Sequence, residues 1–331
     1  MASQNPVSKA DTALEHLVIV PTEGLANRMR AIASAKRLCE LSGARCTVVW
    51  NWQDYEALFA PDPAVEVVSR IPPHAVGTYR AMQTKTTRQG GTPENRRISL
   101  DGPPRIIVTS PHAFGATSDG KAVDTCELVP WIPRPSQAVL ERVRQFKSDA
   151  FPAGTIVGMH MRRTDNDVAI LRSPDRLFIR QAKRLADAGT MIYLATDNRR
   201  TERKMLAHFG GSIFMYPKNP SLARRWPRVF SLEETMEDYA DLLLLASCDF
   251  VLGSMNSSYS RLAMALNGSP NCHTLQGPDS GWMRTTDELR AAFRDRRYLQ
   301  RRLHHLRRRL QPGIGIGKAF GKIWNSLSRR R

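Results

Sequence analysis

The chain has 331 residues, is 41% hydrophobic and 24% charged, and carries a formal net charge of +18 at pH 7. This length and composition are typical of a folded protein with sizeable cores and about two domains. No run of eighteen apolar residues occurs, which argues against a membrane-spanning helix, and five cysteines without a C-x-x-C pair indicate neither a disulfide framework nor a zinc site.

The positive charge is concentrated at the carboxyl-terminal end. Residues 294–331 contain thirteen Lys or Arg and one acidic residue, so this segment carries +12 and the other 293 residues carry +6. Such a tail suits an anionic membrane surface or a nucleic acid, and a solvated or disordered basic end is the alternative. Residues 1–16 are polar and lack the apolar core of a signal peptide. We therefore expect a cytoplasmic protein.

Strands and helices alternate in the first half of the chain. The pattern predicts a strand at 17–21, a helix at 27–42 that Gly43 ends, a strand at 46–50, a short helix at 54–59 and a strand at 105–109. This order is typical of a parallel, doubly wound domain. The stretch 72–104 is rich in Pro, Gly, Thr and Gln and is predicted to be loop.

A turn between the first strand and helix is a candidate for ligand contact. Gly24 and Asn27 lie where the chain enters the helix, and Arg28 and Arg30 lie just inside it. Free N–H groups and a partial positive charge at a helix start favour an anion. Contact with a ligand and ordinary charge on the helix surface both remain open from the sequence.

The second half alternates more regularly. It predicts strands at 155–161, 191–195, 212–215 and 249–253, with helices at 174–188, 199–208, from the capping box Ser231–Glu234 onward, and at 254–266. We divide the chain into a polar segment (1–16), two Rossmann-like domains (17–135 and 136–285) and a basic helical tail (286–331).

The strand at 155–161 ends in two adjacent arginines. If its side chains alternate, three apolar residues share one face and three others share the opposite face: Val157, Met159 and Met161 against Gly158, His160 and Arg162. Arg163 and Asp165 then lie in the following loop. A fixed pair of guanidinium groups at a strand end suits a diphosphate, and a surface ion pair is the alternative.

Two further strands end in polar residues, Thr196-Asp197-Asn198 and Ser254 to Ser258. Parallel strands bring their carboxyl ends to one edge of the sheet. Arginines there bind phosphates, a carboxylate binds ribose or base donors, and hydroxyls at a helix start bind further phosphate oxygens. The three strand ends together predict a nucleotide-sized site.

These motifs resemble those of fucosyltransferases that use GDP-fucose, namely the α1,6-fucosyltransferases, including the nodulation enzymes, and the protein O-fucosyltransferases. The similar elements are His160-x-Arg-Arg-Thr-Asp165, the segment Tyr193 to Asp197, and Asp241 eight residues before Asp249-Phe-Val with its following serines and Arg261. The likeness runs from about 155 to 266, and Gly24-Leu-Ala-Asn27-Arg28 resembles the Gly-Leu-x-Asn element near the amino terminus.

The resemblance implies an α/β, GT-B-like fold of two Rossmann-like domains whose parallel sheets face a central cleft. The domain at 17–135 would lie on the acceptor side, and the domain at 136–285 would bind the nucleotide sugar. It implies inverting, metal-independent transfer of fucose from GDP-fucose, with no cofactor, to a glycan or lipid-linked glycan. Arg162 would stabilise the leaving diphosphate with support from Arg163. The other nucleotide-sugar contacts that we expect are Asn27, Arg28, His160, Asp165, Asp197, Asp241, Ser257 and Ser258.

One departure from the family concerns the acceptor base. The α1,6 enzymes have a glutamate ten residues after the motif histidine, and Ile170 occupies that position here. Asp165 and Asp167 are the nearest carboxylates, and we favour Asp167, because an acid beside arginines has a lowered pKa and is better suited to orient them. His160 is expected to pack and position Arg162 rather than to catalyse.

An apolar stripe in the tail predicts peripheral membrane association. Ile316, Phe320, Ile323, Trp324 and Leu327 share one helix face beside Lys318 and Lys322. A helix docked on its own protein is the alternative.

Two other functions remain open. A non-catalytic nucleotide-sugar or polyanion-binding protein with the same fold is favoured by the missing glutamate. A nucleic-acid-binding protein ranks last, because no recognised motif accompanies the basic charge.

Overall fold

A computed structural model describes residues 14–52, 54–84, 97–98, 104–116, 123–164, 166–218 and 231–277, without the side chains of residues 97, 167 and 168. Within these ranges, no helix has the length and apolar character needed to cross a bilayer. The basic tail and its predicted amphipathic helix lie outside the described residues.

The described elements follow the predicted alternation closely. In the first half they are β1 (His16–Pro21), α1 (Leu25–Ser42), β2 (Arg45–Val49), α2 (Tyr55–Leu58), β3 (Glu66–Val68), η1 (Pro73–Ala75), β4 (Arg80–Gln83), β5 (Arg97–Ile98), β6 (Arg105–Ser110), β7 (Gly115–Ala116) and η4 (Cys126–Trp131). In the second half they are α3 (Gln137–Ala150), β8 (Ile156–Met161), α4 (Asp167–Arg172), α5 (Asp175–Asp187), β9 (Met191–Thr196), α6 (Arg199–Phe209), η5 (Gly210–Ser212), β10 (Ile213–Phe214), α7 (Leu232–Ala246), β11 (Phe250–Ser254), α8 (Ser258–Asn267) and β12 (His273–Leu275).

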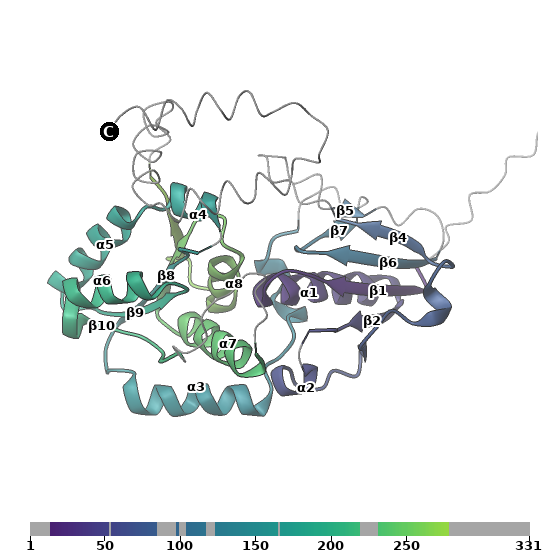
Figure 1. The fold of residues 1–331 in the computed structure, drawn as a ribbon, viewed down its shortest axis with the longest axis horizontal. Helices are drawn as coiled ribbons and strands as arrows, with labels where there is room; N and C mark the ends of the chain where they lie inside the picture. The colour runs from purple at the N-terminus through teal and green to yellow at the C-terminus, as the bar shows by residue number, and fades with distance from the viewer. Residues whose placement is uncertain are drawn as a thin grey trace, which may run out of the picture. The chain divides into compact units, whose positions relative to one another are not determined.

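Each half of the chain forms a parallel five-stranded sheet (Figure 1). The first has the order β3-β2-β1-β6-β4 and the second β10-β9-β8-β11-β12, and every pairing between neighbours is parallel. Strands β5 and β7 pair separately. The α/β fold with two parallel sheets is therefore confirmed, and the central cleft stays a prediction.

The second sheet has a reversal of strand order between β8 and β11. From β8 the chain adds β9 and β10 on one side, and it then returns to add β11 and β12 on the other side. Ligands of open α/β sheets bind beyond the carboxyl ends of the strands at such a switch point. The end of β8 is therefore the place in this sheet where a site is expected.

Side chains of β8 alternate as predicted. Val157, Met159 and Met161 are buried against α5 and α6 in one core cluster. Gly158 faces the opposite layer, where a Cβ atom would lie 2.8 Å from the Leu245 side chain of α7, too close for an ordinary contact. The sheet is thus covered by helices on both faces, which explains the apolar character of its strands.

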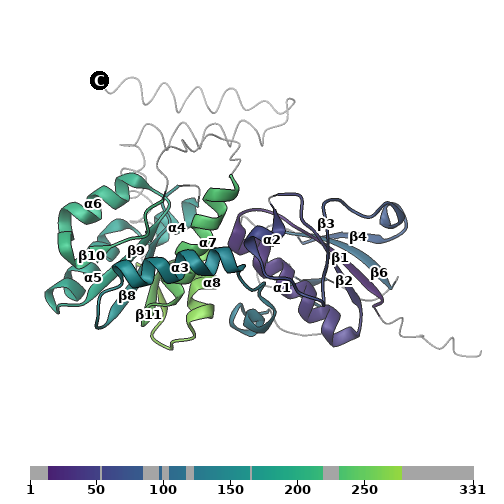
Figure 2. The same ribbon diagram turned by 90° about the horizontal axis from the view of Figure 1, so that it is seen from below.

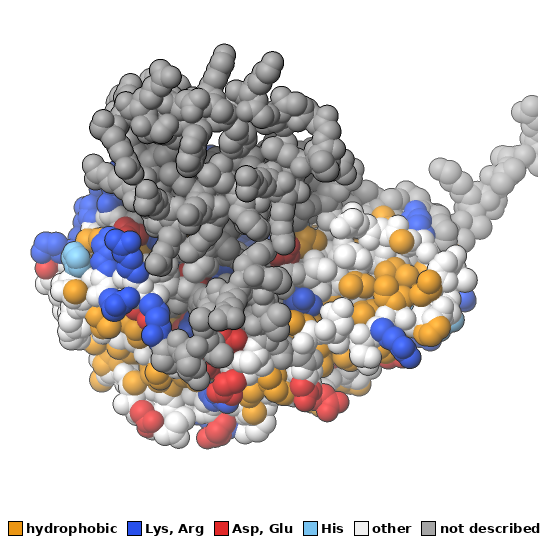
Figure 3. Space-filling model, in the orientation of Figure 1, with side chains coloured by type: hydrophobic (Ala, Val, Ile, Leu, Met, Phe, Trp, Pro, Cys, Tyr) orange, Lys and Arg blue, Asp and Glu red, His pale blue; other side chains and the backbone are white. Residues whose placement is uncertain are grey.

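The helices on the two faces differ in character. Helices α5 and α6 bury one apolar side and expose basic residues on the other: Arg176, Arg180, Lys183, Arg199, Arg200 and Arg203. Figure 3 shows Lys and Arg side chains at the surface of this half of the protein. On the other side, α3 runs along α7 (Figure 2), and both guanidinium nitrogens of Arg142 donate to the carboxylate of Glu233, at 2.6 and 2.8 Å.

Two of the predicted helix ends agree with the structure and one differs from it. Gly43 ends α1 with a φ of 71°, and the capping box of Ser231 with Glu234 opens α7, both as predicted. Ser173 directly before Pro174 suits the N-cap of the predicted helix at 174–188, but Pro174 occupies that position. Ser173 is instead the C-cap of α4, and its hydroxyl accepts the Met255 N–H at 2.8 Å.

The last predicted helix begins four residues later than expected. Asn256 has a left-handed φ of 54°, which a right-handed helix cannot contain, so α8 starts at Ser258. No sequence pattern predicted α4, β3 or β12, and β4 lies inside the stretch 72–104 that was predicted to be loop. The described residues pack as one unit, and the predicted domain boundaries stay predictions.

Candidate functional site

A serine from β11 fixes the backbone at the end of β8. The Ser254 hydroxyl accepts the Arg162 N–H at 3.0 Å and donates to the His160 carbonyl at 3.1 Å. Because one side chain holds the peptide groups on both sides of Met161, the strand end cannot rotate without breaking a buried hydrogen bond. The direction of the Arg162 side chain is therefore set from the β11 side.

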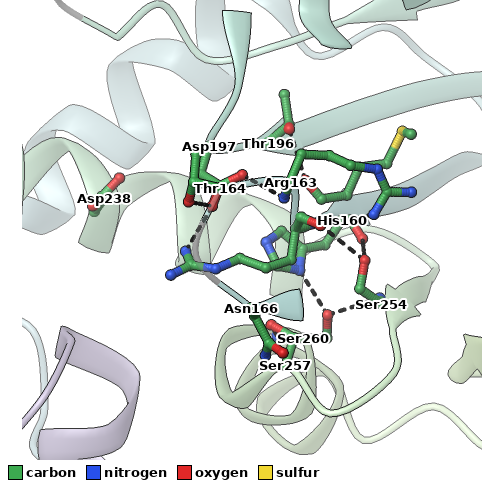
Figure 4. Close-up of polar contacts among 12 residues, drawn as sticks. His160, Arg163, Thr164, Asn166, Thr196, Asp197, Asp238, Ser254, Ser257 and Ser260 are labelled. Carbon is green, nitrogen blue, oxygen red and sulfur yellow. Dashed lines mark hydrogen bonds and ion pairs between the residues drawn. The ribbon is translucent and has the colours of Figure 1, made fainter. Parts of the chain in front are cut away.

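The neighbouring strand β9 holds the same segment from the other side. The Thr196 hydroxyl donates to the Met161 carbonyl at 2.7 Å. The Asp197 carboxylate accepts the Arg163 N–H at 2.7 Å and also the Thr164 hydroxyl. Figure 4 shows these side chains converging on the loop. Hydroxyl and carboxylate groups from two strands thus shape the turn after β8.

An ion pair orients the Arg162 guanidinium. Its Nη1 lies 3.0 Å from Asp197 Oδ2, and the two side chains are 25% and 8% exposed. Burial raises the pKa of Asp197, but the charge of Arg162 and the Thr164 and Arg163 hydrogen bonds outweigh it and lower that pKa to about 2. Asp197 is therefore ionised at neutral pH and holds a guanidinium that is still accessible.

Arg163 has different surroundings and its side chain is only 7% exposed. Its Nε donates to Asp175 at 2.7 Å, its Nη2 donates to the Ser173 carbonyl at 2.6 Å, and its guanidinium carbon lies 5.1 Å from the Phe178 ring centroid. Asp175 also accepts from Lys204 at 2.8 Å. Arg163 therefore anchors the loop to α5, and its direct contact with a diphosphate stays a prediction.

His160 is a buried, neutral residue beneath the loop. It is 3% exposed, its Nδ1 lies 2.6 Å from the Ser260 hydroxyl, and its ring centroid lies 4.7 Å from that of Tyr259. Burial lowers the pKa of His160 most, and the Asp197 carboxylate raises it. The nearby cations lower it again, Arg162 more than Lys218 or Arg163, and the resulting pKa is about 3. An imidazole with this pKa carries no charge at neutral pH.

The start of α8 lies beside this cluster and is linked to the loop. Ser257 is the buried N-cap, whose hydroxyl accepts the Ser260 N–H at 3.4 Å, and Ser258 is the half-buried first residue of the helix. The Asn166 side chain caps α4 and donates to the Asn256 carbonyl at 2.8 Å. The loops after β8 and β11 are therefore tied together next to a helix N-terminus, which favours anions.

Asp241 is held inside the second half. It is 1% exposed, accepts the Tyr193 hydroxyl at 2.5 Å, and pairs with Lys218 Nζ at 2.5 Å. Lys218 also pairs with Asp238 at 3.1 Å. Burial lowers the pKa of Lys218, but these two carboxylates raise it above its ordinary value. Asp241 therefore contributes a charge that is already paired, and its contact with a nucleotide stays a prediction.

The predicted turn of the first half places Arg28 against aromatic rings. Arg28 donates to the carbonyls of Glu23 and Pro21, each at 2.8 Å, and its guanidinium lies 4.6 Å from the Trp52 centroid and 5.4 Å from that of Trp50. Burial lowers its pKa to about 10, so it is still charged at neutral pH.

Gly24 is the N-cap of α1, and Asn27 lies half-buried in its first turn. Arg30 is buried in the core, where its Nε donates to the Thr125 hydroxyl at 3.1 Å. Its side chain is therefore part of the packing of the first half, unlike that of Arg28.

Two predicted acids cannot be placed. Asp165 lies outside the described residues, and Asp167 begins α4 while its side chain lies outside them. Ile170 is half-buried in α4. Across the described ranges, no group of three or more His, Cys, Asp or Glu side chains could hold a metal ion. Metal independence remains a prediction.

Three supporting residues were not identified from the sequence: Thr196, Ser254 and Ser260. Ser254 and Thr196 belong to strand ends that were recognised as polar, but their partners are backbone groups of β8 far away in the sequence. Ser260 follows the N-cap serine by three residues, a spacing that indicates a helix start and carries no sign of a contact with His160.

Solved structures with a similar fold include those of two fucosyltransferases, NodZ and POFUT1. A crystal structure of NodZ, an alpha-1,6-fucosyltransferase co-crystallized with GDP, is 18% identical over 75% of this chain and 91% of its own, with a TM-score of 0.50. The chain has the fold of NodZ. The structure of NodZ from Bradyrhizobium is 16% identical (75% and 92% covered, TM-score 0.48), and POFUT1 in complex with GDP is 12% identical (79% and 97% covered, TM-score 0.46).

The likeness to NodZ confirms the predicted GT-B type of α/β fold. No protein-family model and no curated protein matches the sequence. At 18% identity the likeness to NodZ concerns the fold, so function has to be argued from the side chains.

Proposed function

We propose that the protein is a glycosyltransferase that transfers fucose from GDP-fucose to a glycan or lipid-linked glycan. The observation that carries this proposal is the Arg162 guanidinium, which Asp197 orients at 3.0 Å at the switch point between β8 and β11. Arg162 follows β8, and the neighbouring strand β11 leads into the N-terminus of α8. A fixed cation and a helix start at one sheet edge suit the two phosphates of a nucleoside diphosphate.

The proposed chemistry is inverting transfer without a metal. The acceptor hydroxyl forms a bond to the anomeric carbon as the bond from that carbon to the β-phosphate oxygen breaks, and the hydroxyl proton passes to a base. Negative charge then builds on the departing GDP. Arg162 would stabilise this charge, and because its orientation is set before the reaction, removal of the guanidinium should lower kcat by roughly 10²–10³.

The remaining contacts of the donor follow from the same arrangement. Residues of the first turn of α8 would bind phosphate oxygens, and carboxylates of the second half would bind ribose or base donors. The positions proposed to contact the nucleotide sugar are Asn27, Arg28, His160, Arg162, Arg163, Asp165, Asp197, Asp241, Ser257 and Ser258.

The proposal assigns the acceptor base to Asp167. Ile170 stands where the α1,6 enzymes have their glutamate, and it cannot accept a proton. Asp167 is in α4, immediately after Asn166, whose side chain is tied to the loop following β11. Asp167→Asn should therefore abolish transfer while GDP binding is kept, and full activity of this variant would reject the assignment.

A non-catalytic nucleotide-sugar-binding protein is the second candidate, and Ile170 is the observation that favours it. Measured release of GDP from GDP-fucose, with and without glycan acceptors, separates the two. Turnover establishes an enzyme, whereas tight binding without turnover supports the second candidate.

Thermal-shift measurements with GDP, GDP-fucose and UDP sugars test the donor class. A ligand that binds the native state raises Tm. We expect a rise with guanine nucleotides that is abolished by Arg162→Ala and kept by Arg105→Ala, since Arg105 is 56% exposed and pairs only with Glu15 among the described residues. No rise with any guanine nucleotide would reject the donor assignment.

We further propose that the protein is cytoplasmic and that its tail binds an anionic membrane peripherally. The support is the sequence of 294–331, with its +12 charge and apolar stripe. Deletion of residues 313–331 should abolish co-sedimentation with phosphatidylserine vesicles while the GDP-induced rise in Tm is retained. Unchanged co-sedimentation would reject membrane binding through the tail.

A further inference from the structure

Ser260 contacts two elements of the candidate site through one hydroxyl. It lies in the first turn of α8 and is fully buried. Its Oγ accepts the Ser254 N–H at 3.0 Å and lies 2.6 Å from His160 Nδ1. This close approach requires Gly253, where a Cβ atom would lie 2.6 Å from Ser260 Cβ.

The hydrogen bonds of this hydroxyl determine the proton position on His160. A serine hydroxyl has one hydrogen to donate, and Ser260 already accepts from Ser254. Among the described residues, His160 Nδ1 is the acceptor within reach of that hydrogen. If Nδ1 itself carried a proton, the buried O–H would lose its acceptor, which is unfavourable. Nδ1 is therefore the acceptor, and the neutral ring carries its proton on Nε2.

Helix α8 also fixes the plane of the imidazole. The Tyr259 ring packs against it with centroids 4.7 Å apart and an interplanar angle of 33°. His160 Nε2 makes no hydrogen bond to another described residue, whereas Nδ1 does. Figure 4 shows the His160 ring between Ser260, in the first turn of α8, and the side chains of Thr164 and Asp197, which follow β8 and β9. Nδ1 is thus held by Ser260 of helix α8, and Nε2 lies on the opposite edge of the ring, where Ser260 makes no contact with it.

We propose that Ser260 is a positioning residue that locks His160 in the Nε2–H tautomer, so that the site presents a neutral hydrogen-bond donor to its ligand beside the cationic Arg162. The ligand atom would be an acceptor, either a phosphate oxygen or a carbonyl oxygen or ring nitrogen of the base. The inference rests on the proposed function for the identity of this ligand, and the tautomer itself does not depend on it.

The tautomer is measurable without any ligand. In protein labelled with ¹⁵N-histidine, long-range ¹H–¹⁵N spectra at pH 7 distinguish a protonated from an unprotonated ring nitrogen, and His160→Gln identifies the signals. We expect one Nε2–H tautomer in the wild type and a shift of the His160 ring nitrogens toward a mixture of tautomers in Ser260→Ala. A wild-type proton on Nδ1, or an unaltered tautomer in Ser260→Ala, would overturn the proposal.

Calorimetric titration tests the consequence for binding. Ser260→Ala should bind GDP about five- to tenfold more weakly, as expected for one poorly placed hydrogen bond, and Ser260→Cys, which is close in size, should recover part of the loss. Weaker binding of both GDP and inorganic pyrophosphate assigns the contact to a phosphate, and weaker binding of GDP alone assigns it to the nucleoside. Unchanged GDP affinity together with an altered tautomer would refute the ligand contact.

Ser34→Ala is the matched control. Ser34 is another buried helical serine, and its hydroxyl donates to the Arg30 carbonyl and accepts the Phe114 N–H, each at 3.0 Å. Its loss should lower stability and leave both the His160 signals and GDP affinity unchanged. If the wild type binds no GDP, the proposed function fails, while the tautomer measurement still decides the role of Ser260.

Discussion

Replacement of Asp197 by asparagine tests whether the site is held by charge. The pKa of Asp197 falls from 3.8 to about 2 on folding, and its side chain is 8% exposed. At about 1.36 kcal/mol per pKa unit, a pKa that is lower by roughly two favours the ionised form by about 2–3 kcal/mol. Asparagine keeps the shape and removes the charge that pairs with Arg162. We therefore expect Asp197→Asn to lower the free energy of unfolding by about 2–3 kcal/mol at pH 7.

The pH dependence gives the sign of the effect. Because the folded pKa is depressed, the charge stabilises the protein above about pH 4, and this contribution is lost as the pH falls from about 4 to about 2. Urea unfolding at pH 7, 5 and 3 should show a constant difference between wild type and variant at the two higher values and a smaller one at pH 3. Asp187→Asn, in an exposed helical pair with Lys183, should cost less than about 0.5 kcal/mol. A loss below about 1 kcal/mol for Asp197→Asn at pH 7 would refute the reasoning.

Two further variants separate packing from binding. Gly253→Ala places a Cβ 2.6 Å from Ser260 Cβ and against the Met264 side chain. The variant should lose about 1–3 kcal/mol of unfolding free energy in urea and should also bind GDP more weakly. Wild-type stability would contradict the close approach of α8 to β11. Arg163→Lys keeps the charge but loses the planar contact with Phe178 and the hydrogen bonds from Nη1 and Nη2 to the carbonyls of Arg162 and Ser173. The Tm should therefore fall by several degrees, at about 2–4 °C per kcal/mol of lost stability. GDP at saturating concentration should still raise the Tm of this variant. An unchanged Tm would show that Arg163 does not anchor the loop.

The sequence predicts the layers of the second half because its signals are local. Mainly apolar segments of four to seven residues mark the buried parallel strands, and the capping box at Ser231 marks the start of α7. The strands β3, β4 and β12 have only three or four residues each, and their burial depends on the sheet they join. Their existence is decided by tertiary packing, which a short segment does not encode on its own.

Arg162 and Arg163 are adjacent in the sequence but have different partners, which the sequence does not predict. Alternation along the strand predicts that Arg162 lies on the face of His160, but it does not say which acid each arginine meets. Asp197 comes from the end of β9 and Asp175 from the start of α5. A choice between these carboxylates requires the spacing of the elements in three dimensions, so one adjacent pair in the sequence becomes one accessible guanidinium and one buried anchor.

The position of β8 explains why a single guanidinium can be held so firmly. At a switch point the connections on the two sides lead away from each other, which opens a gap for a ligand but removes the packing that would otherwise support the strand end. Here each neighbouring strand returns a polar side chain to β8: Ser254 from β11 and Thr196 with Asp197 from β9. Two of these three groups are uncharged hydroxyls bonded to backbone atoms. They fix the strand end without neutralising Arg162, whereas the Asp197 carboxylate both orients the guanidinium and tempers its charge.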